Sequence, residues 1–190
     1  MKYLQTYNES LRDKMTPVSD DDIRNKIKGQ PFYGRVLLSA EYGLLDILKD
    51  ALENSGTLVD NEFINEVLKK ASKKGQTDIV LYLIDKYNFD DYGKFNNLIS
   101  YSVDYNHYET TKLFLERCSD KIDINWNNDW LLRVAIYRGN LDMVKLLLEH
   151  GADINKIDVK LGSFRETALN LAREKGFNDV VEYINKKRTE

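Results

Sequence analysis

The stretch "LLRVAIYRGNLDMVKLLLEHGADIN", Leu131–Asn155, holds two short amphipathic segments that are joined at Gly139 and closed by a second glycine, Gly151. Apolar residues recur at helical spacing in the second segment, at Val144, Leu147 and Leu148. Helices this short are marginal in isolation, and so small a unit has too little apolar surface to fold alone. The stretch therefore predicts a repeated unit whose core lies between neighbouring copies.

The surroundings of Gly139 recur along the chain. Each copy has a small residue four positions before a central residue and an acidic residue three positions after it. We call the central residues the anchors; they are Gly43, Gly75, Asn106, Gly139 and Gly176, with spacings of 32, 31, 33 and 37. Four successive intervals near 33 predict an array of about five units.

The anchor residues have a common physical explanation. A short helix that ends in a left-handed residue favours glycine, and asparagine is the usual substitute, as at Asn106. An acidic residue at the start of the following helix complements the helix dipole, and the sequence has one in every unit: Asp46, Asp78, Glu109, Asp142 and Asp179. Five acids in register therefore indicate architecture rather than chemistry.

The repeated unit resembles the ankyrin repeat, with an inner helix, a tight turn, an outer helix and a hairpin-like finger. "GNLDMVKLLLEHGADIN", Gly139–Asn155, is similar to the family pattern. The family's opening Thr-Pro-Leu-His is mostly absent, and Thr167-Ala168-Leu169-Asn170 is its nearest match. The resemblance implies an all-α ankyrin-repeat solenoid of stacked helix–turn–helix pairs. Loss of the threonine and histidine predicts that the early repeats are less regular than the later ones.

This pattern divides the chain in two. Residues 1–31 form a leader and a capping helix, and residues 32–190 form the repeat domain, with units at about 32–60, 61–93, 94–126, 127–158 and 164–190. In "TPVSDDDIRNKI" Ser19 is the expected helix cap, with Ile23 and Ile27 on one face. This helix either covers the first repeat, as end units of solenoids must, or docks a partner through Tyr3, Leu4, Tyr7 and Leu11.

Two connections depart from the pattern. "LERCSDKIDIN", residues 115–125, is longer than "LEHGADIN" and lacks its glycine, so the connection between the third and fourth units should be distorted. "DVKLGSFRE", residues 158–166, explains the interval of 37 as a longer finger. These insertions are either contact points for a partner or variation that the stack tolerates.

Composition excludes several classes of function. The chain has 190 residues, a net charge of −3 and one cysteine, Cys118, so it has no disulfide framework and fits a reducing compartment. It has no secretory signal and no run of 18 apolar residues. We therefore expect a monomeric protein in the intracellular, cytoplasmic space (the host cell cytoplasm or the virion if the protein is viral), with no nucleic-acid partner and no membrane contact.

No residue pattern indicates catalysis or a bound metal or cofactor. His107, His150 and Cys118 lack the short mutual spacing of a zinc site, and we expect structural roles for both histidines. "KKGQTD" has one glycine and no phosphate-binding spacing. The basic cluster Lys69, Lys70, Lys73 and Lys74 is interpreted as a solvated helix face in a net acidic chain.

The resemblance also implies where a partner would bind. In ankyrin-like units the two residues before each anchor project into a concave groove, and tyrosine and arginine there are typical of binding hot spots. We therefore predict a set of partner-binding residues on several units, with Tyr105 and Tyr137 exposed: Tyr42, Lys74, Asp104, Tyr105, Trp126, Tyr137, Arg138 and Lys175.

The sequence as a whole favours a non-catalytic protein–protein interaction module that presents its concave groove to another protein. The alternative is a viral or phage structural or host-interaction component that is anchored through its N-terminal leader, residues 1–17, since "NESLRDKMTP" is similar to N-terminal segments of proteins from large viruses and phages. An enzyme would require a concave pocket with perturbed titratable groups.

Overall fold

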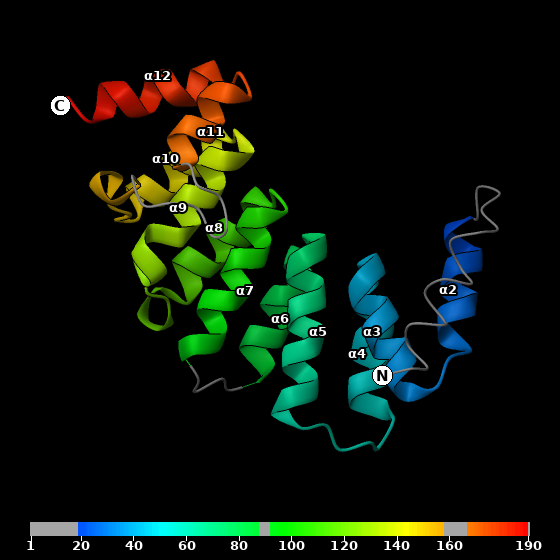
Figure 1. The fold of residues 1–190 in the computed structure, drawn as a ribbon. Helices are drawn as coiled ribbons and strands as arrows, with labels where there is room; N and C mark the ends of the chain where they lie inside the picture. The colour runs from blue at the N-terminus through cyan, green and yellow to red at the C-terminus, as the bar shows by residue number, and fades with distance from the viewer. Residues whose placement is uncertain (1–18, 88–91, 158–166, 190) are drawn as a thin grey trace.

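The structure is a computed structural model that describes residues 19–87, 92–157 and 167–189 (Figure 1). The described residues form α-helices and two short 3₁₀ helices, with no β-strand among them. The elements are α2 (Asp20–Lys28), α3 (Phe32–Tyr42), α4 (Leu45–Asn54), α5 (Asn61–Lys74), α6 (Thr77–Lys86), α7 (Tyr92–Asp104), α8 (Tyr108–Arg117), η1 (Ser119–Lys121), α9 (Trp126–Arg138), α10 (Leu141–Glu149), η2 (Ile154–Lys156), α11 (Ala168–Glu174) and α12 (Asn178–Lys187). The predicted all-α class is confirmed.

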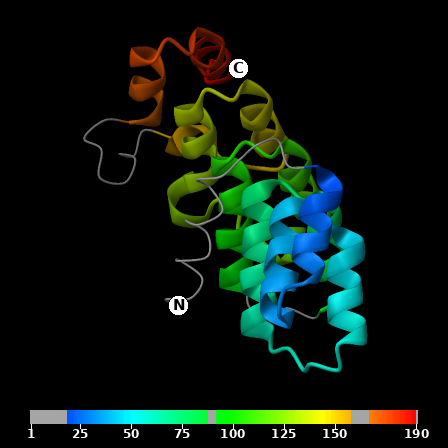
Figure 2. The same ribbon diagram turned by 90° about the vertical axis from the view of Figure 1, so that its right-hand side faces the viewer.

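The helices form antiparallel pairs that stack in one direction. The inner helices α3, α5, α7, α9 and α11 each pack against the next one, and the outer helices α6, α8, α10 and α12 form a second layer behind them. Figures 1 and 2 show this as a curved row that runs from α2 to α12. The predicted solenoid of helix–turn–helix pairs is therefore confirmed, while the division at residue 32 and the exact unit boundaries stay predictions.

Every anchor lies at the turn between the inner and the outer helix of its pair. All five have the left-handed conformation, with φ of 74° at Gly43, 68° at Gly75, 62° at Asn106, 72° at Gly139 and 77° at Gly176. The predicted equivalence of Asn106 with the glycines is confirmed. The backbone reverses direction within two or three residues here, so each pair is a tight hairpin of helices.

The side chain of the residue after an anchor bonds the preceding unit at three of the turns, and these bonds align neighbouring units. Gln76 Nε2 donates to the carbonyl oxygen of Glu41 at 3.1 Å, and His107 Nε2 lies 2.8 Å from the carbonyl oxygen of Lys73. Both carbonyls lie two positions before the preceding anchor. Asn140 instead donates from its side chain to the side-chain oxygen of the preceding anchor, Asn106. The expected structural role of His107 is thus confirmed, and its bond crosses from one unit to the next.

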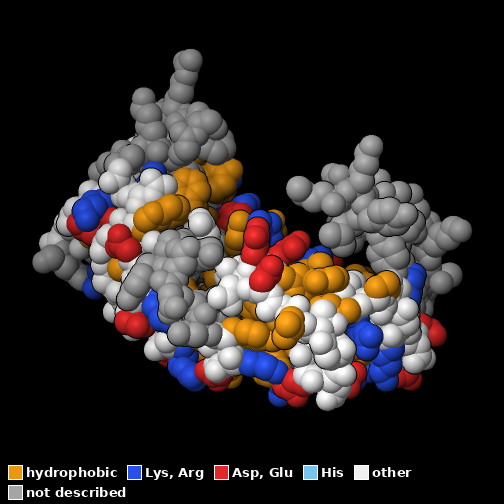
Figure 3. All heavy atoms as spheres, turned by 90° about the horizontal axis from the view of Figure 1, so that it is seen from below, with side chains coloured by type: hydrophobic (Ala, Val, Ile, Leu, Met, Phe, Trp, Pro, Cys, Tyr) orange, Lys and Arg blue, Asp and Glu red, His pale blue; other side chains and the backbone are white. Residues whose placement is uncertain are grey.

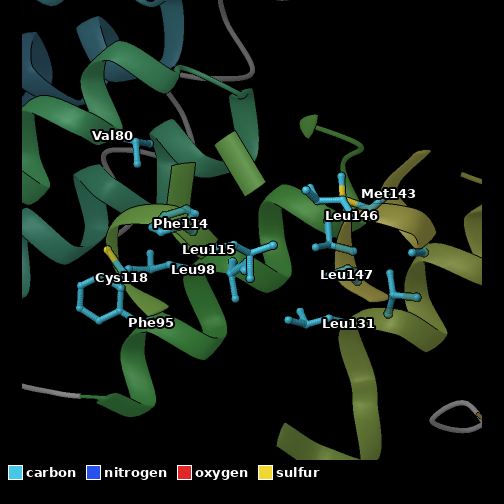
Figure 4. Close-up of a cluster of buried hydrophobic side chains, with 14 of the residues drawn as sticks. Val80, Phe95, Leu98, Phe114, Leu115, Cys118, Leu131, Met143, Leu146 and Leu147 are labelled. Atoms are coloured by element: carbon cyan, nitrogen blue, oxygen red, sulfur yellow. The ribbon is translucent and has the colours of Figure 1, made fainter. Parts of the chain in front are cut away.

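The hydrophobic core is continuous along the array because each pair buries its apolar stripe against its neighbours. Phe95 and Phe114 meet edge to face, with 6.5 Å between ring centroids and 1% and 0% exposure. Figure 4 shows these rings with Cys118, and Leu131 and Met143 on the neighbouring pair. The core therefore lies between units, as the repeat argument requires.

Helix α2 covers the open end of the first pair. Ser19 caps it by accepting from the Asp22 backbone N–H at 3.2 Å, as the sequence predicted. Ile27 is 2% exposed and packs in a small cluster with Leu38 and Ile47. This packing agrees with a covering role for the helix, which stays a prediction. The leader with Tyr3, Leu4, Tyr7 and Leu11 lies outside the described residues, as does the long finger, residues 158–166.

The predicted distortion between the third and fourth units is present. The connection contains η1, and α9 opens with three consecutive residues of positive φ: Asn127 at 54°, Asn128 at 55° and Asp129 at 54°. Irregular backbone among the described residues is therefore not confined to the early repeats, which the sequence predicts to be the less regular ones. This left-handed run lies in the fourth unit, and the first three units have regular helices.

A buried arginine holds this left-handed run in place. Arg133, which is 3% exposed, donates from Nε to the carbonyl oxygen of Asn128 at 2.9 Å and from Nη2 to that of Asn127 at 2.8 Å. The carboxylate of Asp129 accepts the Asp153 backbone N–H at 2.7 Å. Burial raises the pKa of Asp129, which the Asp153 bond and Lys156 only partly offset. Polar contacts therefore tie the start of α9 to the segment after α10 within the fourth unit.

Candidate partner-binding surface

The residues before the anchors form a row at the ends of the inner helices. We call this the groove row: Glu41 and Tyr42, Lys73 and Lys74, Asp104 and Tyr105, Tyr137 and Arg138, Glu174 and Lys175. Because the inner helices pack in series, the row crosses all five units. The structure therefore places seven of the eight predicted partner-binding residues along one line. Trp126 lies apart from it, at the opposite end of α9.

At the junction of the first two units, Glu41 on α3 bonds two lysines of α5. Lys70 Nζ lies 2.8 Å from Glu41 Oε2, and Lys74 Nζ lies 3.5 Å from Oε1. Burial acts to raise the pKa of Glu41, but the two lysines outweigh it, and the pKa is lowered. Lys74, predicted to face a partner, is thus already engaged within the array.

The next two junctions use different chemistry for the same purpose. Between the second and third units, the Nζ atoms of Lys73 and Lys69 lie 4.5 and 5.4 Å from the centroid of the Tyr101 ring. Between the third and fourth units, Arg138 Nη2 lies 2.6 Å from Asp104 Oδ1. Cation–π contacts and ion pairs of this kind each contribute modestly at an exposed site. Together they align neighbouring units.

The last junction joins Tyr137 to the fifth unit. Lys175 Nζ lies 3.5 Å from the centroid of the Tyr137 ring. The ring is half-buried and packs against the core, so the expected exposure of Tyr137 is only partly met. Five predicted residues thus contact each other or Glu41 across unit boundaries: Lys74, Asp104, Tyr137, Arg138 and Lys175.

Two tyrosines of the groove row remain open to solvent. Tyr42 is 47% exposed and Tyr105 is 54% exposed. The Tyr105 ring is stacked on His107, with a centroid distance of 6.4 Å and an interplanar angle of 6°. Since His107 is itself bonded to the second unit, this exposed ring is held in a defined position. Ordered, exposed tyrosines are typical of binding hot spots.

The sequence analysis missed a second exposed feature, at the finger end of the first two inner helices. Leu58 is 95% exposed, and Tyr33, which is 54% exposed, meets the Phe63 ring edge to face at 4.8 Å. We call Tyr33, Leu58, Val59 and Phe63 the finger patch. Together with Asp60 these residues line a pocket of about 260 Å³. A signal existed in "SGTLVDN", residues 55–61, where two apolar residues interrupt a polar turn.

A metal site among the described residues would need clustered ligands, and catalysis by the single cysteine would need a lowered thiol pKa. No group of three or more His, Cys, Asp or Glu side chains in this part of the chain could hold a metal ion. Burial raises the pKa of the Cys118 thiol to about 11, which keeps it protonated at neutral pH. None of the helices in the described ranges is both long and apolar enough to cross a bilayer.

Comparison with known proteins agrees with this geometry. A family model described as ankyrin repeats (3 copies) matches residues 70–158 and again 101–190. The chain is 30% identical to alpha-latrotoxin-Lg1a of Latrodectus geometricus over 142 residues, which is 70% of this chain and 10% of that protein. It is 29% identical to an ankyrin repeat protein of Acanthamoeba polyphaga mimivirus over 119 residues, 63% of this chain and 17% of that protein.

A third relative, alpha-latrotoxin-Lt1a of Latrodectus tredecimguttatus, is 36% identical over 69 residues, which is 35% of this chain and 5% of the relative. In every case the chain spans less than a fifth of the length of the relative that it matches. The similarity therefore concerns the repeat array and not the whole of these larger proteins.

Proposed function

The chain belongs to the ankyrin repeat family, and we propose on this premise that it is a non-catalytic protein-interaction module. Ankyrin repeats in general mediate binding between proteins. The partner of this module is another protein, and it docks along the groove row. The observation that carries the proposal is the pair of exposed tyrosines, Tyr42 and Tyr105, on a row where most of the other members contact a neighbouring unit.

The junction contacts support the mechanism. Because every junction between successive units has a charged contact on this row, the units are aligned before a partner arrives. A surface that is ordered beforehand loses little conformational entropy on binding, so more of the contact energy appears as affinity. In this mechanism Lys74, Asp104, Arg138 and Lys175 stabilise the groove, and Tyr42 and Tyr105 touch the partner.

The proposal can be tested by affinity capture from an extract of the native host. We expect the wild-type protein to retain partners that Tyr42→Ala plus Tyr105→Ala loses, because the two rings supply the exposed contact area. Tyr82→Ala is the matched control, since Tyr82 lies on the outer helix α6 and contacts Glu53 and Lys86 there. An unchanged set of captured proteins, with both variants folded by circular dichroism, would contradict the assignment.

A second candidate function is a viral component that interacts with its host. The similarity to the mimivirus ankyrin repeat protein favours it. Under this alternative the leader, residues 1–17, anchors the protein. Deleting the leader distinguishes the two candidates: capture that fails with this deletion alone supports anchoring, whereas capture that depends on Tyr42 and Tyr105 supports the groove.

A further inference from the structure

Helix α5 presents an open face with an ordered sequence of charges. Its main neighbours among the described elements are α3, α7 and α6, and Glu62, Glu66 and Lys69 on the remaining side are exposed. Glu62, Glu66, Lys69 and Lys73 follow each other at spacings of four, three and four residues, so their side chains share one stripe. The acids lie at the finger end of the helix and the lysines at the anchor end.

These four charges have no oppositely charged partner in the described part of the chain. Among the described residues none of the four forms an ion pair, whereas Lys70 and Lys74 on the neighbouring stripe both pair with Glu41. The Nζ atoms of Lys69 and Lys73 lie over the ring of Tyr101 and not beside a carboxylate of the described residues, which leaves their charge available to an acidic group. The acids and lysines are separated by up to about 16 Å, which is the rise of eleven helical residues.

The finger patch lies beside the acidic end of this stripe. Phe63 is on α5 next to Glu62, and Asp60 lines the pocket. Drug-sized ligands occupy roughly 300–1,000 Å³, so a pocket of about 260 Å³ suits a single large side chain. Figure 3 shows hydrophobic side chains gathered on the face seen from below, with acidic side chains next to them.

We propose that this face binds a protein segment of opposite charge order: a large apolar side chain flanked by basic residues enters the finger patch, and acidic residues about 10–16 Å away meet Lys69 and Lys73. The proposal rests on the proposed function and specifies the chemistry of the partner. Charge complementarity sets the direction in which the segment lies along α5. The large apolar side chain of the segment makes that direction unique, because the finger patch lies at one end of the stripe.

Two synthetic peptides test the charge order. The first peptide has a tryptophan between two lysines, then a spacer of five glycine and serine residues, and then two glutamates. The extended spacer spans about 16 Å. The second exchanges the lysines and the glutamates. Binding of each fluorescein-labelled peptide is measured by anisotropy at low ionic strength. We expect the wild-type protein to bind the first peptide about tenfold more tightly, a difference of about 1.4 kcal/mol.

A protein with exchanged charges should invert this preference. The variant combines Glu62→Lys, Glu66→Lys, Lys69→Glu and Lys73→Glu, and we expect it to prefer the second peptide. Should it not fold, Glu62→Gln plus Glu66→Gln should reduce the preference, because these exposed residues lose their charge at nearly unchanged size while Lys69 and Lys73 remain. Raising the salt to about 1 M, where the Debye length is about 3 Å, should also remove it.

Leu58→Ser should weaken binding of both peptides, since both insert the same tryptophan. The same preference in the wild-type and the charge-exchanged protein would overturn the proposal, as would a lack of measurable binding of either peptide. This failure is distinct from that of the proposed function. Host partners that depend on Tyr42 and Tyr105 would still establish the groove row if the peptides showed no charge order.

Discussion

At the scale of single residues, the anchor glycines have two separate roles. Their positive φ is unfavourable for a residue with a Cβ, and three of them also leave space for the side chain that follows the next anchor. A Cβ on Gly139 would lie 2.5 Å from a ring carbon of Phe177. At Gly176 a Cβ would meet nothing within 4 Å, although φ is nearly the same.

This difference predicts unequal costs for the same substitution. Gly176→Ala should lower the free energy of unfolding by about 1 kcal/mol through backbone strain alone. Gly139→Ala should lower it by about 3 kcal/mol, because the Phe177 ring must also move. Urea unfolding followed by circular dichroism measures both. Equal losses in the two variants would show that conformation alone selects glycine at the anchors.

Asn106 shows how an anchor without glycine is accommodated. It has a φ of 62°, which asparagine tolerates better than most residues, and its side chain bonds Asn140 of the next unit. At Asn106 a polar contact between side chains therefore replaces the close packing of a neighbouring side chain on the glycine, as it occurs at Gly75 and Gly139. The sequence predicts the left-handed conformation of Asn106 but not its bond with Asn140, since the two residues are 34 positions apart.

At the scale of elements, α9 is the exception among the inner helices. Its first turn is left-handed in three non-glycine residues, and such conformations persist only where surrounding structure stabilises them. The two bonds from Arg133 to the carbonyls of Asn127 and Asn128 supply that stabilisation. The turn replaces the ordinary start of the helix, and it places Asp129 where it receives the Asp153 backbone N–H.

Arg133→Lys should therefore destabilise the protein more than an ordinary exchange of basic residues. Lysine cannot reproduce two bonds from one planar guanidinium, so we expect a loss of about 2 kcal/mol. Arg138→Lys is the matched control, because its exposed pair with Asp104 should contribute about 0.5 kcal/mol. Thermal and urea unfolding measure the difference. A similar small loss at both positions would mean that Arg133 does not hold the turn.

At the scale of the whole molecule, the units are connected at two levels. Apolar side chains form one core along the array, and polar contacts on the groove row join each unit to the next. The core supplies most of the stability because hydrophobic burial dominates folding. The polar contacts orient the units, and this orientation determines whether a groove with a fixed shape exists.

The Glu41 junction predicts a pH dependence of stability. Its pKa is lowered in the folded protein, so its contribution is fully present above the ordinary value of 4.5 and is lost as the pH falls through the lowered value. Wild type should exceed Glu41→Gln by about 0.5–1 kcal/mol at about pH 6, and the difference should shrink below about pH 4. Urea unfolding over this pH range measures it.

Glu66→Gln is the control for this measurement, since Glu66 is exposed and forms no ion pair among the described residues. Its stability difference from wild type should depend less on pH than that of Glu41→Gln, because no lysine pairs with Glu66 among the described residues. A constant difference for Glu41→Gln would show that the lysines of α5 do not stabilise the carboxylate between the first two units.

The sequence by itself determined the features that depend on local interactions. The anchors, the helix pairs, the Ser19 cap and the apolar stripes follow from residue preferences within a few positions, and these preferences act the same way in every unit. The distorted connection before α9 was also visible as a change in length and the loss of a glycine. Fold and unit number were therefore predictable without coordinates.

Only the tertiary structure decided how the surface is used. Lys74, Asp104, Arg138 and Lys175 contact neighbouring units because residues about 30 positions apart become adjacent when the pairs stack. The finger patch arises in the same way, since Tyr33 and Phe63 meet only when α3 and α5 pack. Local preferences carry no information on such contacts, whose energy depends on the geometry between units.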